Sequence, residues 1–304
     1  MGCFGQAETL YVILPYFNFC NFRRRRELFC HFVETFRQTP QVRIVVSEAL
    51  SEGADALPSL PVWKHIRTRT DSRIWLKENL VNLAVETLPR RWEYMAWIDA
   101  DIEFLNRNWV QDTFAKLKTV DVVQLFRSAA NLGPDGEIAK VDKGFAYMAK
   151  GSGTPWTSTD KYGFWHPGYA WACTRRAYKK MGGLVDWAIL GSGDRHMAMA
   201  LDGRVMQSAP GNIHINYKSM LQEFECKCRG LKLGWVDGTI VHYWHGNFAD
   251  RRYKERWEIL TRNNFDPLVD IGVTRQGLIQ LTREGRRFEK FLDEYFAGRK
   301  EDST

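Results

Sequence analysis

The sequence has none of the features that anchor a chain in a membrane or mark it for export. No apolar run approaches the roughly 20 residues of a transmembrane helix. The run Leu10–Leu14 is too short for a signal peptide, and no small-residue cleavage site follows it. A myristoylation motif begins at Met1, but Gln6 stands where Ser or Thr is required. We therefore predict a soluble, cytoplasmic protein without a transmembrane segment.

Cysteine pairs with metal-binding spacing are also absent. The six cysteines are scattered and none forms a Cys-x-x-Cys pair, which argues against a structural zinc site. No nucleic-acid-binding module and no internal repeat is recognisable, so a nucleic acid is not the predicted partner. The net charge is nevertheless +7, which favours a smaller anionic partner such as a nucleotide diphosphate.

Four segments near the start of the chain predict a nucleotide-binding α/β fold. The apolar runs Thr9–Pro15, Val42–Val46 and Val62–Ile66 have the composition of strands buried on both faces. Between the first two, Arg23–Arg37 has the spacing of an amphipathic helix. This β-α-β-β order is typical of an α/β protein. A length of 304 residues allows one large domain of this kind or two small ones.

Polar residues follow the first two predicted strands. Ligands of open α/β sheets bind beyond the carboxyl ends of the strands. Pro15, Tyr16 and Asn18 follow the first strand and Glu48 follows the second, so we expect these four residues near a base and ribose. Each has an alternative role as a turn or capping residue. The residues alone leave both roles open.

In the stretch Trp97-Ile98-Asp99-Ala100-Asp101 a buried-strand pattern ends in two carboxylates. If the strand continues through both aspartates, their side chains share one face, because side chains alternate along a strand. Two carboxylates so close together repel each other unless a cation compensates them. Because oxygen ligands suit Mg²⁺ or Mn²⁺, Asp99 and Asp101 are candidate metal ligands. The alternative is a pair of solvated aspartates at a strand end.

This stretch resembles the Asp-x-Asp motif of nucleotide-sugar glycosyltransferases with the GT-A fold. The resemblance is to galactosyltransferase-like enzymes and to viral and bacterial enzymes of glycan synthesis. It implies a Rossmann-like α/β fold with a mixed, mainly parallel sheet flanked by helices. It also implies that Asp99 and Asp101 hold a metal ion and that Asp99 contacts the nucleotide donor.

The segment before the motif fits the same family. Many GT-A enzymes have a helix there with a Lys or Arg and an Asn that touch the donor. Trp75-Leu76-Lys77-Glu78-Asn79, inside the predicted helix Asp71–Leu88, is similar to that helix. Lys77 and the nearby Arg73 are therefore candidate donor-binding residues. Ordinary surface charges are the alternative.

Two segments after the motif follow the family order. His166–Thr174 returns to strand character, and its Gly168 matches a glycine-containing strand that lines the donor sugar in GT-A enzymes. Leu190–Ala198 resembles the Gly-x-Gly-x-Glu-Asp element of galactosyltransferase-like enzymes, although no Glu precedes Asp194. The resemblance implies that Asp194 is the catalytic base, and the alternative is a helix N-cap. Between the motifs, Asn131–His166 is predicted to be an irregular substrate-side loop.

The segment from Val241 to Gly246 contains a second metal-binding pattern, His242-Tyr243-Trp244-His245. Histidines at i and i+3 lie on neighbouring positions of a helical turn and can converge on one cation. In galactosyltransferase-like enzymes the third metal ligand comes from a segment of this sort. The resemblance implies that His242 or His245 completes the metal site while the other packs. The arginines of Arg251–Arg256 are candidates for phosphate contact or a solvated face.

The motifs together predict two parts of the chain and one activity. Residues 1–266 form the GT-A domain, and 267–304 form a helical extension that packs on it, with membrane-surface contact as the alternative. The implied reaction transfers a sugar from a nucleotide-sugar, most simply a UDP-sugar, to a hydroxyl of a glycan or other acceptor. It uses Mn²⁺ or Mg²⁺ and inverts the anomeric carbon.

Two other functions stay open. One is a nucleotide-sugar-binding protein without transferase activity. The other is a sugar nucleotidyltransferase, which shares the α/β layout and paired aspartates. Such an enzyme would normally have a Gly-rich loop after its first strand, and residues 15–21 contain no glycine.

Overall fold

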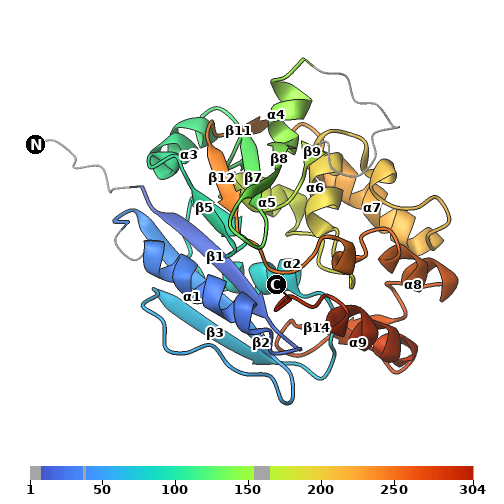
Figure 1. Cartoon of the computed structure of the whole chain (residues 1–304). Coiled ribbons are helices and arrows are strands. Elements are labelled where there is room, and N and C mark those ends of the chain that lie inside the picture. The colour runs from blue at the N-terminus through green and yellow to red at the C-terminus, as the bar shows by residue number, and fades with distance from the viewer. Residues whose placement is uncertain (1–7, 37–38, 154–164, 304) are drawn as a thin grey trace, which may run out of the picture.

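A seven-stranded sheet forms the centre of the protein, in the order β11-β6-β10-β4-β1-β2-β3 (Figure 1). The computed structural model describes residues 8–36, 39–153 and 165–303. Neighbouring strands of this sheet are parallel except around β10, which runs antiparallel to β4 and β6. The strands are β1 (Leu10–Phe17), β2 (Val42–Leu50), β3 (Lys64–Arg69), β4 (Tyr94–Ile98), β6 (Val122–Gln124), β10 (Ala170–Thr174) and β11 (Leu233–Trp235). The predicted α/β class with a mixed, mainly parallel sheet is confirmed.

Helices cover both faces of the sheet, as the side-chain alternation in β1 requires. Leu10, Val12 and Leu14 belong to a hydrophobic cluster with α1 and α3, whereas Ile13 and Phe17 belong to a second cluster with α2 and α5 to α7. Burying an apolar side chain of this size contributes about 1.5–3 kcal/mol, so the pattern strongly favours this register. The helices are α1 (Arg23–Phe36), α2 (Lys77–Glu86), α3 (Trp109–Leu117), α5 (Arg175–Met181), α6 (Gly193–Leu201) and α7 (Ile215–Cys228).

Two boundaries next to the predicted site differ from the sequence prediction. Helix α2 begins at Lys77 rather than at Asp71, because the preceding segment is irregular and Trp75 N–H donates to the Ile189 carbonyl at 2.8 Å. Strand β4 ends at Ile98, and the two aspartates lie in the turn that follows it. The condition under which both side chains would share one face, a strand that continues through both aspartates, is therefore not met.

A second, five-stranded sheet lies beside the first, in the order β5-β12-β7-β8-β9. Its strands, with the helix that follows β8, are β5 (Ile102–Phe104), β7 (Ser128–Leu132), β8 (Ile138–Gly144), α4 (Phe145–Lys150), β9 (Trp165–His166) and β12 (Thr239–His242). The prediction of an irregular loop over Asn131–His166 is wrong as far as residue 153, and 154–164 lie outside the described residues. Strand β8 was not predicted because most of its side chains are exposed, so it lacks an apolar repeat.

The last part of the chain packs against its beginning. It contains the strands β13 (Ile271–Val273) and β14 (Ile279–Leu281) and the helices α8 (Arg256–Arg262), η3 (Gly285–Phe288) and α9 (Glu289–Ala297). Phe296 of α9 packs on Phe19 near β1, with ring centroids 5.4 Å apart. In the view of Figure 1 the last described residues lie over the middle of the molecule, and Asp302 accepts hydrogen bonds from the Arg23 and Arg24 backbone N–H groups. The domain boundary after residue 266 stays a prediction.

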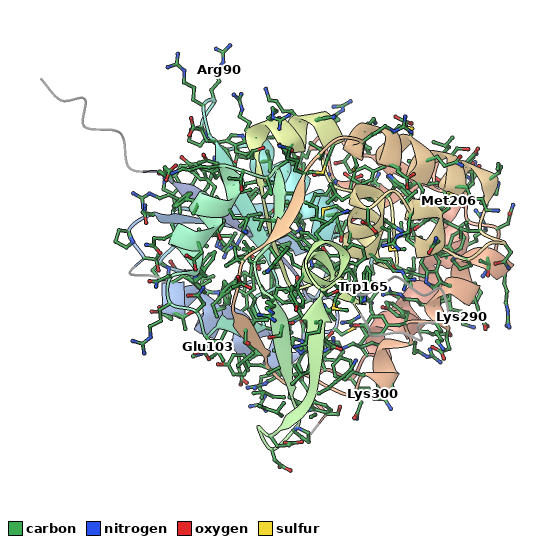
Figure 2. The ribbon with its side chains drawn as sticks, turned by 90° about the horizontal axis from the view of Figure 1, so that it is seen from above. Arg90, Glu103, Trp165, Met206, Lys290 and Lys300 are labelled. Atoms are coloured by element: carbon green, nitrogen blue, oxygen red, sulfur yellow. The ribbon has the colours of Figure 1, made fainter. Side chains whose placement is uncertain are left out.

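Apolar side chains fill the interior of the molecule, and charged side chains cover much of its surface. Figure 2 shows Trp165 within the molecule, whereas Arg90 and Lys290 extend from its edge. In the described ranges, no helix combines the length and apolar character needed to cross a bilayer. The five cysteines in these ranges are unpaired.

Candidate active site

A cavity of about 670 Å³ lies at the carboxyl ends of β1 and β4, the edge at which the sequence places its ligand site. Segments that are far apart in sequence meet there, including the starts of α2 and α6 and the end of β12. The predicted site residues that line it are Pro15, Tyr16, Lys77, Asp99, Asp101, Gly168, Asp194, His242 and His245. Most of the predicted site is thus brought together.

Three predicted residues lie outside the lining of this cavity. Asn18 accepts a hydrogen bond from Phe22 N–H at 2.9 Å and so stabilises the entry to α1. Glu48 is completely buried and accepts from Leu57 N–H and the Arg67 side chain at 2.6 and 2.8 Å. Burial opposes ionisation of Glu48, but these contacts and His65 hold its pKa below the usual value. Arg73 is exposed and pairs with Asp293 at 3.4 Å.

Asp101, His242 and His245 form the group best suited to a metal ion. Within the residues that the structure describes, only these three acidic, histidine or cysteine side chains converge in this way, with ligand atoms within 4.8 Å of one another. His245 Nε2 lies 2.9 Å from Asp101 Oδ2 and 3.3 Å from His242 Nε2, and His242 Nε2 lies 3.8 Å from the same oxygen. These separations suit three ligands that each lie about 2 Å from one cation.

Strand pairing, not a helical turn, brings the two histidines together. His242 ends β12, which pairs with β5 so that His242 lies opposite Ile102. The next residue, Tyr243, donates its N–H to the Asp101 carbonyl at 2.9 Å. His245 lies in the loop that follows. The predicted helical geometry is wrong, although the predicted convergence of both side chains on one position is observed.

The electrostatics of this group favour metal binding. Burial lowers the pKa of His242 to about 4, so its imidazole is neutral at pH 7 and keeps a lone pair for a metal. Burial opposes ionisation of Asp101, yet its contacts with His242 and His245 hold its pKa well below the usual range. Asp101 Oδ1 and His242 Nδ1 are buried without a hydrogen-bond partner in the described structure. Buried polar atoms without a hydrogen-bond partner are rare unless a ligand or an ion binds them.

Asp99 has a different partner. Its Oδ1 lies 2.6 Å from Lys77 Nζ, and the same ammonium lies 2.7 Å from Asp194 Oδ2. Burial alone would lower the pKa of Lys77, but Asp194 and Asp99 raise it above its usual value. Burial raises the pKa of Asp99 to about 6 despite the attraction of Lys77. The chain therefore supplies its own cation to Asp99.

The close approach of α2 and α6 places Asp194 beside Lys77. A Cβ on Gly193 would lie 2.3 Å from Glu78 Oε1, so this contact requires glycine. Ser192 adopts a left-handed conformation with φ of 81° and is the N-cap residue of α6. Asp194 thus lies in the first turn, where the helix dipole favours a negative charge, and its side chain lines the cavity. The alternative role of Asp194 as the N-cap is not observed.

A stack of rings supports the metal-ligand group from behind. His166 lies flat on Tyr169 with ring centroids 3.9 Å apart, and Tyr169 contacts His242 at 4.8 Å. Tyr169 has φ of 73°, an unfavourable value for a bulky residue. This conformation allows its carbonyl to accept from Asp99 N–H at 2.7 Å. Gly168 lies between His166 and Tyr169 in the sequence. It faces Asp194, since a Cβ on Gly168 would lie 3.6 Å from Asp194 Oδ2.

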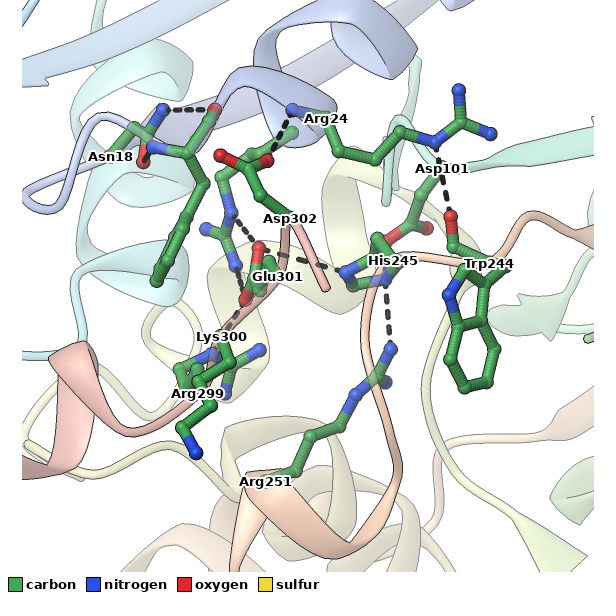
Figure 3. A network of polar contacts seen from close by, with 12 residues as sticks. Asn18, Arg24, Asp101, Trp244, His245, Arg251, Arg299, Lys300, Glu301 and Asp302 are labelled. Carbon is green, nitrogen blue, oxygen red and sulfur yellow. Dashed lines mark hydrogen bonds and ion pairs between the residues drawn. The ribbon is translucent and has the colours of Figure 1, made fainter. Parts of the chain in front are cut away.

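Glu301 is a site residue that the sequence did not reveal. Figure 3 shows it between Arg299 and His245. Its carboxylate binds Arg25 at 2.6 and 2.7 Å and Arg299 at 2.6 Å, and it lies 3.6 Å from His245 Nδ1. Burial opposes its ionisation, but Arg25 and Arg299 hold its pKa well below the usual range. Because Glu301 belongs to a short polar stretch, its sequence resembles that of a solvated tail.

No protein-family model matches the sequence, and no curated protein is significantly similar to it in sequence. Several solved structures align with most of its length. The catalytic domain of a β1,4-galactosyltransferase 7 from Drosophila, in complex with xylobiose, is 12% identical, with a TM-score of 0.43 over 94% of this chain and 99% of that chain. A mutant of the same enzyme, in complex with manganese, UDP-Gal and xylobiose, is 13% identical, with a TM-score of 0.46 over 93% and 98%.

A mannosyltransferase from Pyrobaculum calidifontis, in complex with GDP-Man and Mn²⁺, is 16% identical, with a TM-score of 0.47. The alignment covers 97% of this chain and 70% of that chain. A 4-diphosphocytidyl-2C-methyl-D-erythritol synthase from Anaerococcus prevotii is 11% identical, with a TM-score of 0.35 over 77% and 90%. Likeness at this level does not assign an activity, which has to be argued from the cavity itself.

Proposed function

We propose that the protein is a metal-dependent glycosyltransferase with a GT-A-type fold. It transfers a sugar from a nucleotide-sugar, most simply a UDP-sugar, to a hydroxyl group of a glycan or other acceptor. The observation that carries this proposal is that one cavity holds both the Asp101, His242 and His245 group and the carboxylate of Asp194. The first can bind a cation for a diphosphate, and the second can accept a proton from a hydroxyl.

The residues present fit a divalent cation. Asp101, His242 and His245 would hold it, and Asp101 Oδ1 has no other partner in the described structure. A set of one carboxylate and two imidazoles suits Mn²⁺ better than Mg²⁺, which prefers oxygen ligands. When bound, the ion supplies positive charge against the charge that develops on the departing diphosphate. Asp99 fits a role beside Lys77 or the ribose better than a direct bond to the metal.

Asp194 is the proposed general base of an inverting transfer. Lys77 holds Asp194 Oδ2 at 2.7 Å and so fixes the orientation of the carboxylate. We assign its other oxygen, Oδ1, to the proton of the acceptor hydroxyl. Gly168 leaves room for a substrate between Asp194 and the ring of His166, because a Cβ there would lie 3.1 Å from that ring.

A donor screen tests the proposal. Nucleotide-sugars are titrated by calorimetry with and without Mn²⁺, and acceptor products are sought by mass spectrometry. We expect a UDP-sugar to bind only with Mn²⁺ and to lose its sugar to an acceptor. Binding without transfer would indicate a binding protein, and release of pyrophosphate from a nucleoside triphosphate and a sugar phosphate would indicate a nucleotidyltransferase. If no nucleotide binds in a metal-dependent manner, the proposal is wrong.

A further inference from the structure

We propose that the acceptor carries an anionic group, a phosphate or a carboxylate, and that Arg256 binds this group next to Asp194. The inference rests on the proposed sugar transfer and names the substrate class on its acceptor side. It starts from an excess of buried positive charge in the cavity.

Four of the arginines that line the cavity come from different segments: Arg25, Arg251, Arg256 and Arg299. The last three are at most 7% exposed. Glu301 is the only carboxylate within ion-pair distance of any of the four in the described ranges, and it binds Arg25 and Arg299. Arg251 and Arg256 have no carboxylate partner there. A buried guanidinium without an anion is unfavourable, so the cavity is built for anionic ligands.

Arg251 and Arg256 both contact Tyr253 but have different hydrogen-bond partners otherwise. Arg251 Nη2 lies 2.9 Å from His245 Nε2, at the metal-ligand group, and its Nε is buried without a partner in the described structure. Arg256 Nη2 instead donates to Ser192 Oγ at 2.7 Å, two residues before Asp194. Its Nη1 lies 3.4 Å from the Tyr295 hydroxyl, which fixes the guanidinium from the other side. Arg251 is thus placed for the donor diphosphate, and Arg256 for a group near the acceptor hydroxyl.

The charge of the donor does not account for both arginines. The two positive charges of a divalent cation, less the negative charge of Asp101, leave one charge of a nucleotide-sugar diphosphate for Arg251 to balance. Lys77 is compensated by Asp99 and Asp194. The positive charge of Arg256 therefore remains for a second anion. The N–H groups of a planar guanidinium match the oxygen atoms of a phosphate and those of a carboxylate equally well. The proposed class of acceptors therefore includes both anions.

Small anions test the proposal before an acceptor is known. Methyl phosphate and acetate are titrated by calorimetry into protein saturated with Mn²⁺ and UDP, with sodium chloride at matched ionic strength as the blank. We expect at least one of them to bind while UDP stays bound. Preference for methyl phosphate would indicate a phosphorylated acceptor, and preference for acetate a carboxylated one.

Three variants locate the site. Arg256→Gln should weaken anion binding about 30-fold or more, because it removes one partner of a buried charge pair. Arg256→Lys keeps the charge but loses the fork, so it should bind with intermediate affinity and shows whether a loss in Arg256→Gln reflects misfolding. Arg262→Gln changes an exposed arginine of the same helix, whose side chain is 77% exposed and pairs with Glu258, and should bind like the wild type.

Three results would overturn the proposal: neither anion binds, Arg256→Gln binds as the wild type does, or UDP displaces the anion. The last result would assign Arg256 to the donor diphosphate. If UDP itself shows no Mn²⁺-dependent binding, the proposed function fails instead. The anion titration is then repeated on metal-free protein, where its dependence on Arg256 still decides whether the anion site exists.

Discussion

Two aspartates, Asp99 and Asp101, follow the same strand, but the protein compensates their charges in different ways. Asp99 lies 2.6 Å from the buried ammonium of Lys77, which it shares with Asp194. Asp101 faces two imidazoles, and burial keeps one of them, His242, neutral with a pKa of about 4. The first carboxylate has a cation within the chain, and the second lies beside two imidazoles with room for an added cation. An Asp-x-Asp pair in this protein therefore joins two unlike half-sites.

The largest effect is expected at the Lys77 half-site. Asp194→Asn should lower the rate of sugar transfer by about 10²–10⁴-fold, because it removes a positioned acid–base group, while leaving UDP-sugar affinity nearly unchanged. Steady-state kinetics and calorimetry on the same sample measure the two quantities. Asp202→Asn, at the other end of α6, is the matched control and should keep wild-type turnover.

Wild-type turnover in Asp194→Asn would remove this residue from the mechanism. Asp186 and Glu223 would be poorly placed to replace it. Asp186 accepts hydrogen bonds from Asn82 and Asn79 at 2.9 and 3.3 Å, and Glu223 pairs with Lys227 on the surface of α7. Neither lines the cavity. A retaining mechanism would then have to be considered.

The second prediction compares the two aspartates directly. Asp101→Asn should weaken Mn²⁺ binding about 100-fold or more, since loss of a ligand exceeds the 10–100-fold effect of altering a residue behind one. Asp99→Asn should have a much smaller effect on metal affinity, because Lys77 already compensates Asp99. Calorimetric titration of Mn²⁺ in the presence of UDP measures both. Equal losses in the two variants would show that both aspartates coordinate the metal and would end the distinction between the half-sites.

The third prediction concerns His196, a histidine outside the cavity whose low pKa comes chiefly from burial and not from a place near the metal-ligand group. Burial lowers the pKa of His196 to about 3, and its ring nitrogens contact Ser208 Oγ and the Tyr217 hydroxyl. Below pH 6.5 the unfolded chain binds a proton here that the folded protein does not, so stability falls as the pH falls. At pH 5 the resulting loss in the free energy of unfolding is about 2 kcal/mol.

Chemical denaturation of metal-free protein at pH 8 and pH 5 measures this difference. The variant His196→Gln removes the titrating group but keeps polar atoms. Between pH 8 and pH 5 its free energy of unfolding should fall by about 2 kcal/mol less than that of the wild type. An unchanged pH dependence would mean that His196 takes up a proton in the folded protein.

The smallest effect is expected behind the metal-ligand group. Glu301→Gln should weaken Mn²⁺ binding about tenfold, because a carboxylate near the second nitrogen of a ligating histidine orients its ring. The matched control is Asp302→Asn, which alters the neighbouring residue but contacts the start of α1 rather than His245. The same metal titration compares the two. Equal affinities in both variants would make Glu301 a partner of Arg25 and Arg299 only.

The parts of the fold that the sequence predicts are those with a local physical signal. The apolar run before Asp99 predicts β4, which ends at Ile98, and helix α5 spans Arg175–Met181. Its signal is local, since Thr174 caps it by accepting from Ala177 N–H. The late start of α2 depends on a hydrogen bond between Trp75 and Ile189, more than a hundred residues apart. No local pattern encodes such a contact.

The same distinction applies to the candidate site. Asp101, His242 and His245 were predicted because their residue types are common metal ligands at recognisable spacings. Their convergence through the β5–β12 pair, however, depends on long-range register. The role of Glu301 depends on pairing with Arg25, which is 276 residues away in the sequence. Charge compensation between distant residues is a property of the folded chain, so it could not be predicted from either segment.

The position of Glu301 also has a consequence for biosynthesis. Arg299 is the last residue in sequence that lines the cavity, and Glu301 follows it, so both leave the ribosome after the rest of the lining. The backbone around Lys300 packs closely on Gly246 in the loop that carries His245. A nascent chain can form the central sheet before these residues appear, since domains fold as synthesis proceeds. In such a chain His245 lacks the Glu301 carboxylate that lies behind it, and Arg25 lacks the same carboxylate, which it shares with Arg299 in the folded protein. The surroundings of His245 are therefore completed only after the segments that form the central sheet have been synthesised, so the sheet and the candidate site form in that order.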